Sequence, residues 1–177
     1  MKNKKTMQIV ILALFVIVGG YTITSGLFKE SNPLPQEGKE VPAFELTDLE
    51  GNQVSLSMFE GQPVIINFWG TFCEPCVREM PLIEDYYQTY QEDGLVVLGV
   101  NLAEPKLRVQ TFIEDMGVSF PILMDPGSKT RKDYGVSSFP TTFFVNEQGE
   151  LASEVIGEMT ESTMRIHLSK IMSQPLK

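Results

Sequence analysis

Two cysteines form the most specific chemical pattern in this chain. Cys73 and Cys76 are its only cysteines, and Glu74 and Pro75 separate them. Residues three apart lie on one face of a helix, so the two sulfurs can form a disulfide without moving the backbone. At the start of a predicted helix, Cys73 faces unpaired backbone N–H groups and the positive end of the helix dipole, and both favour a thiolate. The spacing therefore predicts Cys73 as the attacking thiol and Cys76, one turn further on, as the resolving thiol.

Two other roles for this pair have less support. A structural disulfide would close so small a loop that it removes little entropy from the unfolded chain. A zinc site would need two further ligands, whereas the only histidine is His167, in the last predicted helix. We therefore predict redox chemistry at an internal disulfide, with no metal and no other cofactor.

The elements that must position the pair follow from the apolar pattern. A hairpin is predicted around residues 48–52, followed by a short turn at 57–59 capped by Ser57. Strands are predicted at 63–69, 95–101, 121–124, 141–146 and 151–156, and helices at 73–90, 106–116, 128–134 and 160–172. Strands that alternate with helices predict an α/β fold whose helices cover both faces of a mixed sheet. The cysteines then follow the buried strand 63–69, at the carboxyl end where such sheets place their functional sites. Pro81 is expected to kink the first helix.

These motifs resemble a known family. The segment from Phe68 to Cys76 is similar to the active-site segment of thioredoxin-like proteins, and Ser138 to Thr141 is similar to their cis-proline loop. The N-terminal hairpin, the strand and helix between residues 95 and 116, Glu79 and the run at 140–143 narrow the resemblance to the ResA-type oxidoreductases of Gram-positive bacteria. The resemblance covers essentially the whole chain. It implies a thioredoxin-like fold with an N-terminal β-hairpin and a central strand–helix insertion.

The resemblance also implies an activity. Members of that family reduce the disulfide in the haem-binding motif of exported apocytochrome c, which allows haem attachment, and a membrane thiol carrier re-reduces them. The implied partners are therefore apocytochrome c, or another exported disulfide-bearing protein, and that carrier. Relatives of this type also serve spore-coat or cell-wall maturation, so a reductase for such disulfides is an alternative.

Several site residues follow from the resemblance. Phe139 and Pro140 should form the wall of the substrate groove, beside Glu74 and Pro75. Trp69, the only tryptophan, should lie next to the cysteines, unless it serves ordinary core packing.

Besides disulfide exchange and substrate binding, we expect proton transfer at this site. Thioredoxins carry a buried aspartate at the position of Asn67, and an amide cannot titrate. Glu79, on the same side of the helix as both cysteines, is the nearest proton acceptor and matches the active-site glutamate of the ResA type. Partial burial should raise its pKa above the reference of ~4.3. An exposed helix carboxylate without function is the alternative.

The charges near the cysteines favour a reductant. Glu74 and Glu79 should raise the pKa of Cys73 and keep the disulfide comparatively stable, while Arg78 opposes them and is expected to face solvent. Glu104 follows the second buried strand and would either face a basic partner or lie in a solvated turn.

Three rival functions remain. A peroxidase of the peroxiredoxin class would need a threonine three residues before the reactive cysteine, and Thr71 is two before it. A copper carrier of the anchored thioredoxin-like type would need two cysteines separated by three residues and a better placed histidine. A disulfide-introducing oxidant would differ in its reduction potential.

The N-terminus indicates export. Residues 6–28 carry no charge and follow Lys2, Lys4 and Lys5, so this segment is just long enough to span a bilayer with the N-terminus inside. We predict a cytoplasmic N-terminus (1–8), a transmembrane anchor (9–28), a tether (29–40) and an extracytoplasmic thioredoxin-like domain (41–177). A cleaved signal peptide is the alternative, although no Ala-x-Ala site is present.

The charge of the exported part excludes one class of partner. From Glu30 onward there are 10 basic and 23 acidic residues, a net charge of −13, because Lys2, Lys4, Lys5 and Lys29 precede it. Such a surface repels nucleic acid. The 177 residues with 42% hydrophobic content suffice for one domain with its own core.

Overall fold

The computed structural model describes residues 11, 13, 14 and 34–177, and the chain divides into two units, Met1–Asn32 and Pro33–Lys177. In the first unit Ile11, Ala13 and Leu14 are helical, and the rest of the predicted anchor lies outside the described residues. Among the described residues, no helix combines the length and hydrophobicity that crossing a membrane requires. The second unit begins within the predicted tether. The Gly38 N–H donates to the Leu151 carbonyl, and the backbone of Glu40 forms an isolated antiparallel β-bridge with that of Glu150.

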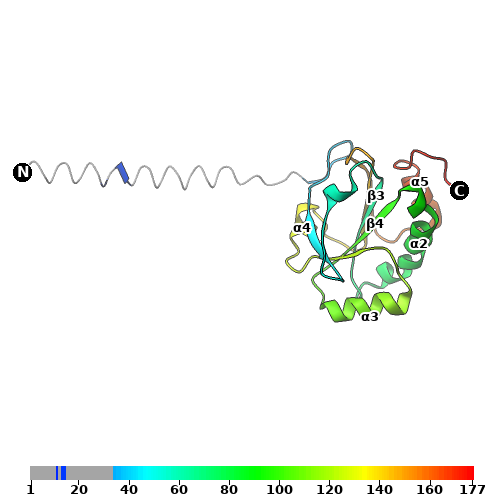
Figure 1. Cartoon of the computed structure of the whole chain (residues 1–177), viewed down its shortest axis with the longest axis horizontal. Helices are drawn as coiled ribbons and strands as arrows, with labels where there is room; N and C mark the ends of the chain where they lie inside the picture. The colour runs from blue at the N-terminus through cyan, green and yellow to red at the C-terminus, as the bar shows by residue number, and fades with distance from the viewer. Residues whose placement is uncertain (1–10, 12, 15–33) are drawn as a thin grey trace, which may run out of the picture. The chain divides into compact units, whose positions relative to one another are not determined.

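The second unit is an α/β domain built on one seven-stranded sheet (Figure 1). The strand order is β2-β1-β5-β4-β3-β6-β7. In chain order the strands are β1 (Glu45–Asp48), β2 (Gln53–Ser55), β3 (Val64–Trp69), β4 (Val96–Asn101), β5 (Ile122–Met124), β6 (Thr141–Val145) and β7 (Leu151–Ile156). The helices are α2 (Glu74–Tyr90), α3 (Lys106–Met116), α4 (Lys129–Asp133) and α5 (Glu161–Leu168), with short 3-10 turns η1 (Leu56–Phe59) and η2 (Gln91–Asp93). Strands β3, β4 and β5 are parallel, whereas β6, β7 and the β1–β2 hairpin pair antiparallel.

The fold agrees with the predicted order of elements, and the differences lie at their ends. Helix α2 begins at Glu74 because Cys73 is its N-cap, and it continues through Pro81 to Tyr90. The 3-10 turn η1 is capped at Ser55 rather than at Ser57. Thr160 caps α5 as predicted, but the helix ends at Leu168 instead of near residue 172, because the N–H groups of Lys170 and Ile171 donate to carbonyls three residues back.

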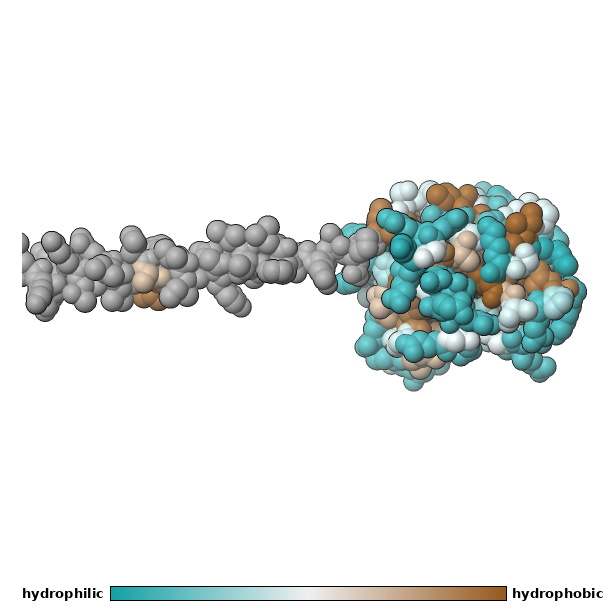
Figure 2. All heavy atoms as spheres, turned by 90° about the horizontal axis from the view of Figure 1, so that it is seen from above, coloured by the Kyte–Doolittle hydropathy of each residue, from teal (hydrophilic) through white to brown (hydrophobic). Residues whose placement is uncertain are grey.

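The sheet separates two apolar layers. All six residues of β3 are buried, and their side chains alternate between the faces. Ile65 and Trp69 join the layer formed with α2, α3 and α5, while Val64, Ile66 and Phe68 join the layer formed with the β1–β2 hairpin and Tyr134. Asn67 shares the face of Ile65 and Trp69, so its side chain points toward α2. Figure 2 shows one face of the domain, on which hydrophilic residues dominate and hydrophobic residues form small separate spots.

Candidate active site

The cysteine pair forms a disulfide at the start of α2. Cys73 and Cys76 are bonded, and the Cys73 Sγ also accepts a hydrogen bond from the Cys76 N–H at 3.2 Å. The pair follows directly on the carboxyl end of β3, where a turn from Gly70 to Cys73 is closed by a backbone hydrogen bond of 3.1 Å. Cys76 is fully buried, while Cys73 keeps 8% of its surface exposed. The more accessible sulfur-bearing residue is thus Cys73, while the order of attacking and resolving thiol stays a prediction.

The two residues between the cysteines lie in the first turn of α2, where proline needs no hydrogen-bond donor. The Glu74 side chain is 86% exposed and pairs with Arg78 at 3.2 Å, one turn further on. Exposure leaves Glu74 free to meet a docking chain, but it also means that water screens its effect on Cys73.

Glu79 is buried on α2, three residues after Cys76. Its side chain is almost inaccessible, and its two oxygens have separate donors: Oε1 accepts from Asn67 Nδ2 at 2.8 Å, and Oε2 accepts from the Met159 N–H at 2.9 Å. Burial raises the pKa of Glu79 to about 7, against the opposing effect of these two hydrogen bonds. A carboxyl group that is half-protonated near neutral pH can both release and accept a proton, as the sequence led us to expect.

Asn67 connects Glu79 to the sheet. Its Nδ2 donates to Glu79 and also to the Thr142 hydroxyl at 2.9 Å, so Asn67 links α2 to β6. Its Oδ1 is buried and, within residues 34–177, has no hydrogen-bond partner. The Thr142 contact was not predicted, because only the pairing of β3 with β6 brings residues 67 and 142 together.

A short segment between β7 and α5 closes over Glu79. Gly157 N–H donates to the Pro140 carbonyl at 2.8 Å, and Glu158 accepts three hydrogen bonds from the guanidinium of Arg78. Met159 then donates its N–H to Glu79. Arg78 is half-exposed, as predicted, but it is paired with Glu74 and Glu158.

Phe139 and Pro140 lie before β6 and are joined by a cis peptide bond. Phe139 is half-buried and Pro140 is buried. The Phe139 ring contacts Phe72 edge to face, with 6.4 Å between ring centroids, and the Arg131 guanidinium lies over it at 5.2 Å.

Phe72 is an unpredicted part of this face. It lies next to Cys73 and is 64% exposed. A Cβ on Gly70 would approach the Phe72 ring to 2.5 Å, so only glycine at position 70 leaves room for the ring there. The sequence could have indicated this. Phe72 is an apolar residue between a turn and a reactive cysteine, a place where no core position is expected.

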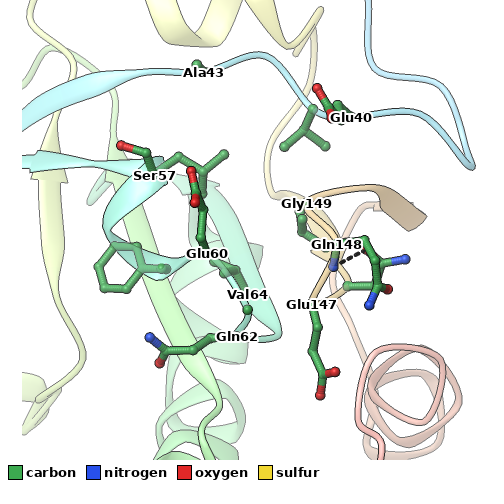
Figure 3. A pocket seen from close by; sticks show the side chains of 15 residues that line it. Glu40, Ala43, Ser57, Glu60, Gln62, Val64, Glu147, Gln148 and Gly149 are labelled. Atoms are coloured by element: carbon green, nitrogen blue, oxygen red, sulfur yellow. Dashed lines mark hydrogen bonds between the residues drawn. The ribbon is translucent and has the colours of Figure 1, made fainter.

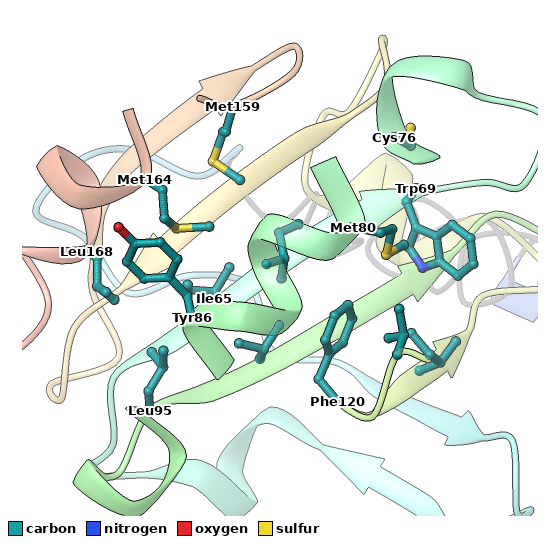
Figure 4. Close-up of a cluster of buried hydrophobic side chains, with 14 of the residues drawn as sticks. Ile65, Trp69, Cys76, Met80, Tyr86, Leu95, Phe120, Met159, Met164 and Leu168 are labelled. Carbon is teal, nitrogen blue, oxygen red and sulfur yellow. The ribbon is translucent and has the colours of Figure 1, made fainter. Parts of the chain in front are cut away.

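Trp69 does not offer its ring to a substrate in this structure. It is fully buried in the core, where its ring packs against Phe112 at 5.6 Å between centroids, and Figure 4 shows it beside Met80 of α2. Its Nε1 is buried without a partner among the described residues. Trp69 therefore packs in the core, as the last residue of a strand buried on both faces, and it belongs to the same buried cluster as Cys73 and Cys76.

Glu104 faces the active-site loop and not a partner or solvent, which corrects both expectations for this residue. Its carboxylate accepts from the Thr71 N–H at 2.7 Å, from the Thr71 hydroxyl at 2.5 Å and from Asn101 Nδ2 at 2.9 Å. Ala103, just before it, adopts a left-handed conformation with φ of 53°, which turns the chain so that Glu104 points inward. The Thr71 hydroxyl is thereby engaged with Glu104, which weakens the peroxidase alternative.

Two other features lie outside this site. His167 Nδ1 contacts the Ser153 hydroxyl at 2.8 Å on β7 and belongs to the packing of α5. A cavity of about 460 Å³ opens at the other end of the sheet, between η1 and the β6–β7 turn (Figure 3). Its lining includes Val64 and Val145, at the ends of β3 and β6 remote from the disulfide, and none of the predicted site residues.

A thioredoxin-like sheet that carries a disulfide at the start of α2 and a cis-proline loop beside it defines the class of thiol–disulfide oxidoreductases. Residues 38–154 match the AhpC/TSA family. Two curated relatives are similar over nearly all of their length. Thiol-disulfide oxidoreductase ResA of Geobacillus thermodenitrificans is 39% identical over 96% of this chain and 97% of its own. That of Halalkalibacterium halodurans is 43% identical over 88% of each chain.

Solved structures agree with this. StoA from Bacillus subtilis is 31% identical, with a TM-score of 0.61 over 70% of this chain and 93% of its own. A putative thiol:disulfide interchange protein DsbE from Chlorobium tepidum is 26% identical, with a TM-score of 0.72 over 77% of this chain and 99% of its own. The chain belongs to the ResA thiol–disulfide oxidoreductases, within the AhpC/TSA family.

Proposed function

We propose that this oxidoreductase is a membrane-anchored reductase that opens the disulfide of the haem-binding cysteine pair in exported apocytochrome c. The observation that carries the proposal is Glu79: a buried carboxyl group with a pKa of about 7, three residues after Cys76 on α2. A carboxylate at this position opposes a thiolate on Cys73 and so keeps the disulfide form comparatively stable, which is the property of a reductant.

The chemistry follows from the geometry. The reduced enzyme attacks the substrate disulfide through the Cys73 sulfur, which forms a mixed disulfide and releases one substrate thiolate. Cys76 then attacks the Cys73 sulfur, releases the second substrate thiol and closes the enzyme disulfide. The two electrons that reduce the substrate come from the enzyme dithiol, and Glu79 supplies or removes protons. A membrane thiol carrier then returns two electrons to the enzyme disulfide.

Three neighbouring side chains form the surface that we expect the substrate to contact, which we call the substrate face. Phe72 and Phe139 present apolar surface next to Cys73, and Glu74 presents a carboxylate. The net charge of −13 from Glu30 onward favours encounter with a basic partner.

The test is a trapping experiment in cells. In Cys76→Ala the mixed disulfide cannot be resolved, so Cys73 should remain bonded to its substrate and the substrate can be identified by mass spectrometry. Cys73→Ala, the matched control, should trap nothing. Capture of apocytochrome c through its haem-binding cysteines supports the proposal, whereas capture of other exported proteins alone would shift the substrate to the envelope alternative.

The proposed anchoring has a separate test. The uncharged segment 6–28 behind three lysines supports a retained anchor with the domain outside. The full-length protein should stay in the membrane fraction, and its domain should be open to external protease. A mature soluble protein that begins near residue 27 would contradict the anchor.

A further inference from the structure

In both hydrogen bonds of the Glu79 carboxyl group, the carboxyl oxygen is the acceptor and an N–H group is the donor. Asn67 Nδ2 donates to Oε1 and the Met159 N–H donates to Oε2. These partners suit the ionised carboxylate, and neither can accept the proton of the neutral acid. Yet burial raises the pKa of Glu79 to about 7, so the neutral acid is well populated near neutral pH. The proton of that acid needs an acceptor.

The Asn67 amide contains such an acceptor on its other side. In the structure both hydrogens of Nδ2 are used, one toward Glu79 and one toward the Thr142 hydroxyl, while Oδ1 is buried and has no partner among the described residues. The oxygen and nitrogen of an amide are nearly equal in size, so the group fits the same space when it is turned over. Oδ1 would then accept from both the Glu79 O–H and the Thr142 O–H.

The unpartnered proton of the neutral acid provides the driving force for this reversal. A buried O–H without an acceptor costs roughly 1–3 kcal/mol. Turning the amide over restores the bond to Glu79, and it places the two N–H groups of Nδ2, instead of Oδ1, on the side that has no partner among the described residues.

We propose that Asn67 is a positioning residue that turns its amide over with each protonation change of Glu79, donating to the carboxylate and accepting from the acid. The proposal deepens the proposed function, since it takes Glu79 to be the proton carrier. It explains why an amide can stand at this position: the Asn67 side chain cannot titrate, but it can stabilise both states of the residue that does.

The neighbouring charges leave Glu79 as the group that titrates. On α2, Cys73 and Cys76 are bonded to each other in the oxidised protein, and Arg78 stays charged. In the segment before α5, the hydrogen bonds from Arg78 hold the pKa of Glu158 below its ordinary value. Glu161 on α5 bonds the Tyr86 hydroxyl, and β3 and β6 contribute Asn67 and Thr142, which do not titrate.

The test is nuclear magnetic resonance on the full-length oxidised chain. At about pH 9 the Asn67 side-chain amide protons should show cross-peaks to the Thr142 side chain, and at about pH 5 these should be lost, with the same midpoint as the Glu79 carboxyl carbon. Cross-peaks that persist while Glu79 titrates would overturn the proposal, as would a Glu79 that does not titrate in this range.

A pair of variants provides a second measurement. Asn67→Leu removes the donor of the carboxylate and the acceptor of the acid together, so the Glu79 midpoint should move by well under one unit, whereas loss of a donor that serves the carboxylate alone would raise it by roughly one unit. Asn101→Leu, which replaces another buried asparagine on the neighbouring strand β4, should leave the midpoint unchanged. A midpoint raised by about one unit or more in Asn67→Leu would show that Asn67 serves the carboxylate alone, and it would contradict the proposal. Both measurements use oxidised protein without substrate, so their outcome is independent of the trapping experiment that tests the proposed function.

Discussion

The carboxylate of Glu104 accepts hydrogen bonds from both the backbone N–H and the hydroxyl of Thr71, at 2.7 and 2.5 Å. It thereby holds the loop that leads from β3 to Cys73. The Glu104 side chain is only 7% exposed, and it is the acceptor for the part-buried donors of Thr71 and for the side-chain amide of Asn101.

Loss of this carboxylate should destabilise the domain. Glu104→Ala leaves the part-buried donors of Thr71 and Asn101 without this acceptor, which should lower the free energy of unfolding by about 1–3 kcal/mol. Urea unfolding of the variant and of the wild type measures this loss of free energy. Glu114→Ala, at an exposed position on α3, serves as control and should cost at most about 0.5 kcal/mol. Equal losses in the two variants would show that Glu104 does not stabilise the loop.

The raised pKa of Glu79 should make stability depend on pH. Because the folded state holds the proton up to about pH 7, whereas the unfolded chain releases it near its ordinary pKa, the contribution of Glu79 is complete below that ordinary pKa and is lost as the pH rises through about 7. Between about pH 4.5 and pH 8, oxidised wild type should therefore lose roughly 2–3 kcal/mol more than Glu79→Gln. Denaturant unfolding of both proteins over this range tests it, since the other groups titrate in both and cancel. Parallel stability curves would argue against a perturbed Glu79.

The same substitution should change the thiols of the reduced protein. Glu79→Gln removes a negative charge near Cys73, so the Cys73 pKa should fall and the reduction potential should move in the oxidising direction, each unit of pKa being worth ~1.36 kcal/mol. Reduction of a haem-motif peptide should nevertheless slow, because the proton carrier is lost. Thiolate absorbance and peptide turnover are the two measurements. If neither changes, Glu79 has no part in the reaction.

Phe72 should contribute to docking and little to folding. Its ring is 64% exposed beside Cys73 and contacts Phe139, so Phe72→Ala should raise KM for a disulfide peptide several-fold, at about 1 kcal/mol for a lost aromatic contact, with a nearly unchanged unfolding midpoint. Met58→Ala provides the control, because Met58 is 61% exposed on η1, next to the cavity at the other end of the sheet. A KM that is the same for Phe72→Ala and wild type would remove Phe72 from the substrate face.

Local spacing was enough to predict part of this site. Cys73, Cys76 and Glu79 lie within two turns of one helix, so helical periodicity places them together. The contacts of Glu79 with Thr142 through Asn67, and with Met159, depend on strand pairing and on a loop 80 residues away. The direction of Glu104 depends on the left-handed conformation of Ala103, which an alanine side chain does not announce. Trp69 was predicted at the end of a strand, as observed, but its burial depends on the helices that cover the end of β3.

The segment from Gly157 to Met159 joins the two sides of the site mechanically. Gly157 is bonded to the Pro140 carbonyl, and Met159, two residues later, is bonded to Glu79. A substrate chain that pulls on the Pro140 loop would therefore strain the Met159 bond as well. Because that hydrogen bond lowers the pKa of Glu79, docking on one side of the disulfide would in this way favour the protonated form of the acid on the other side.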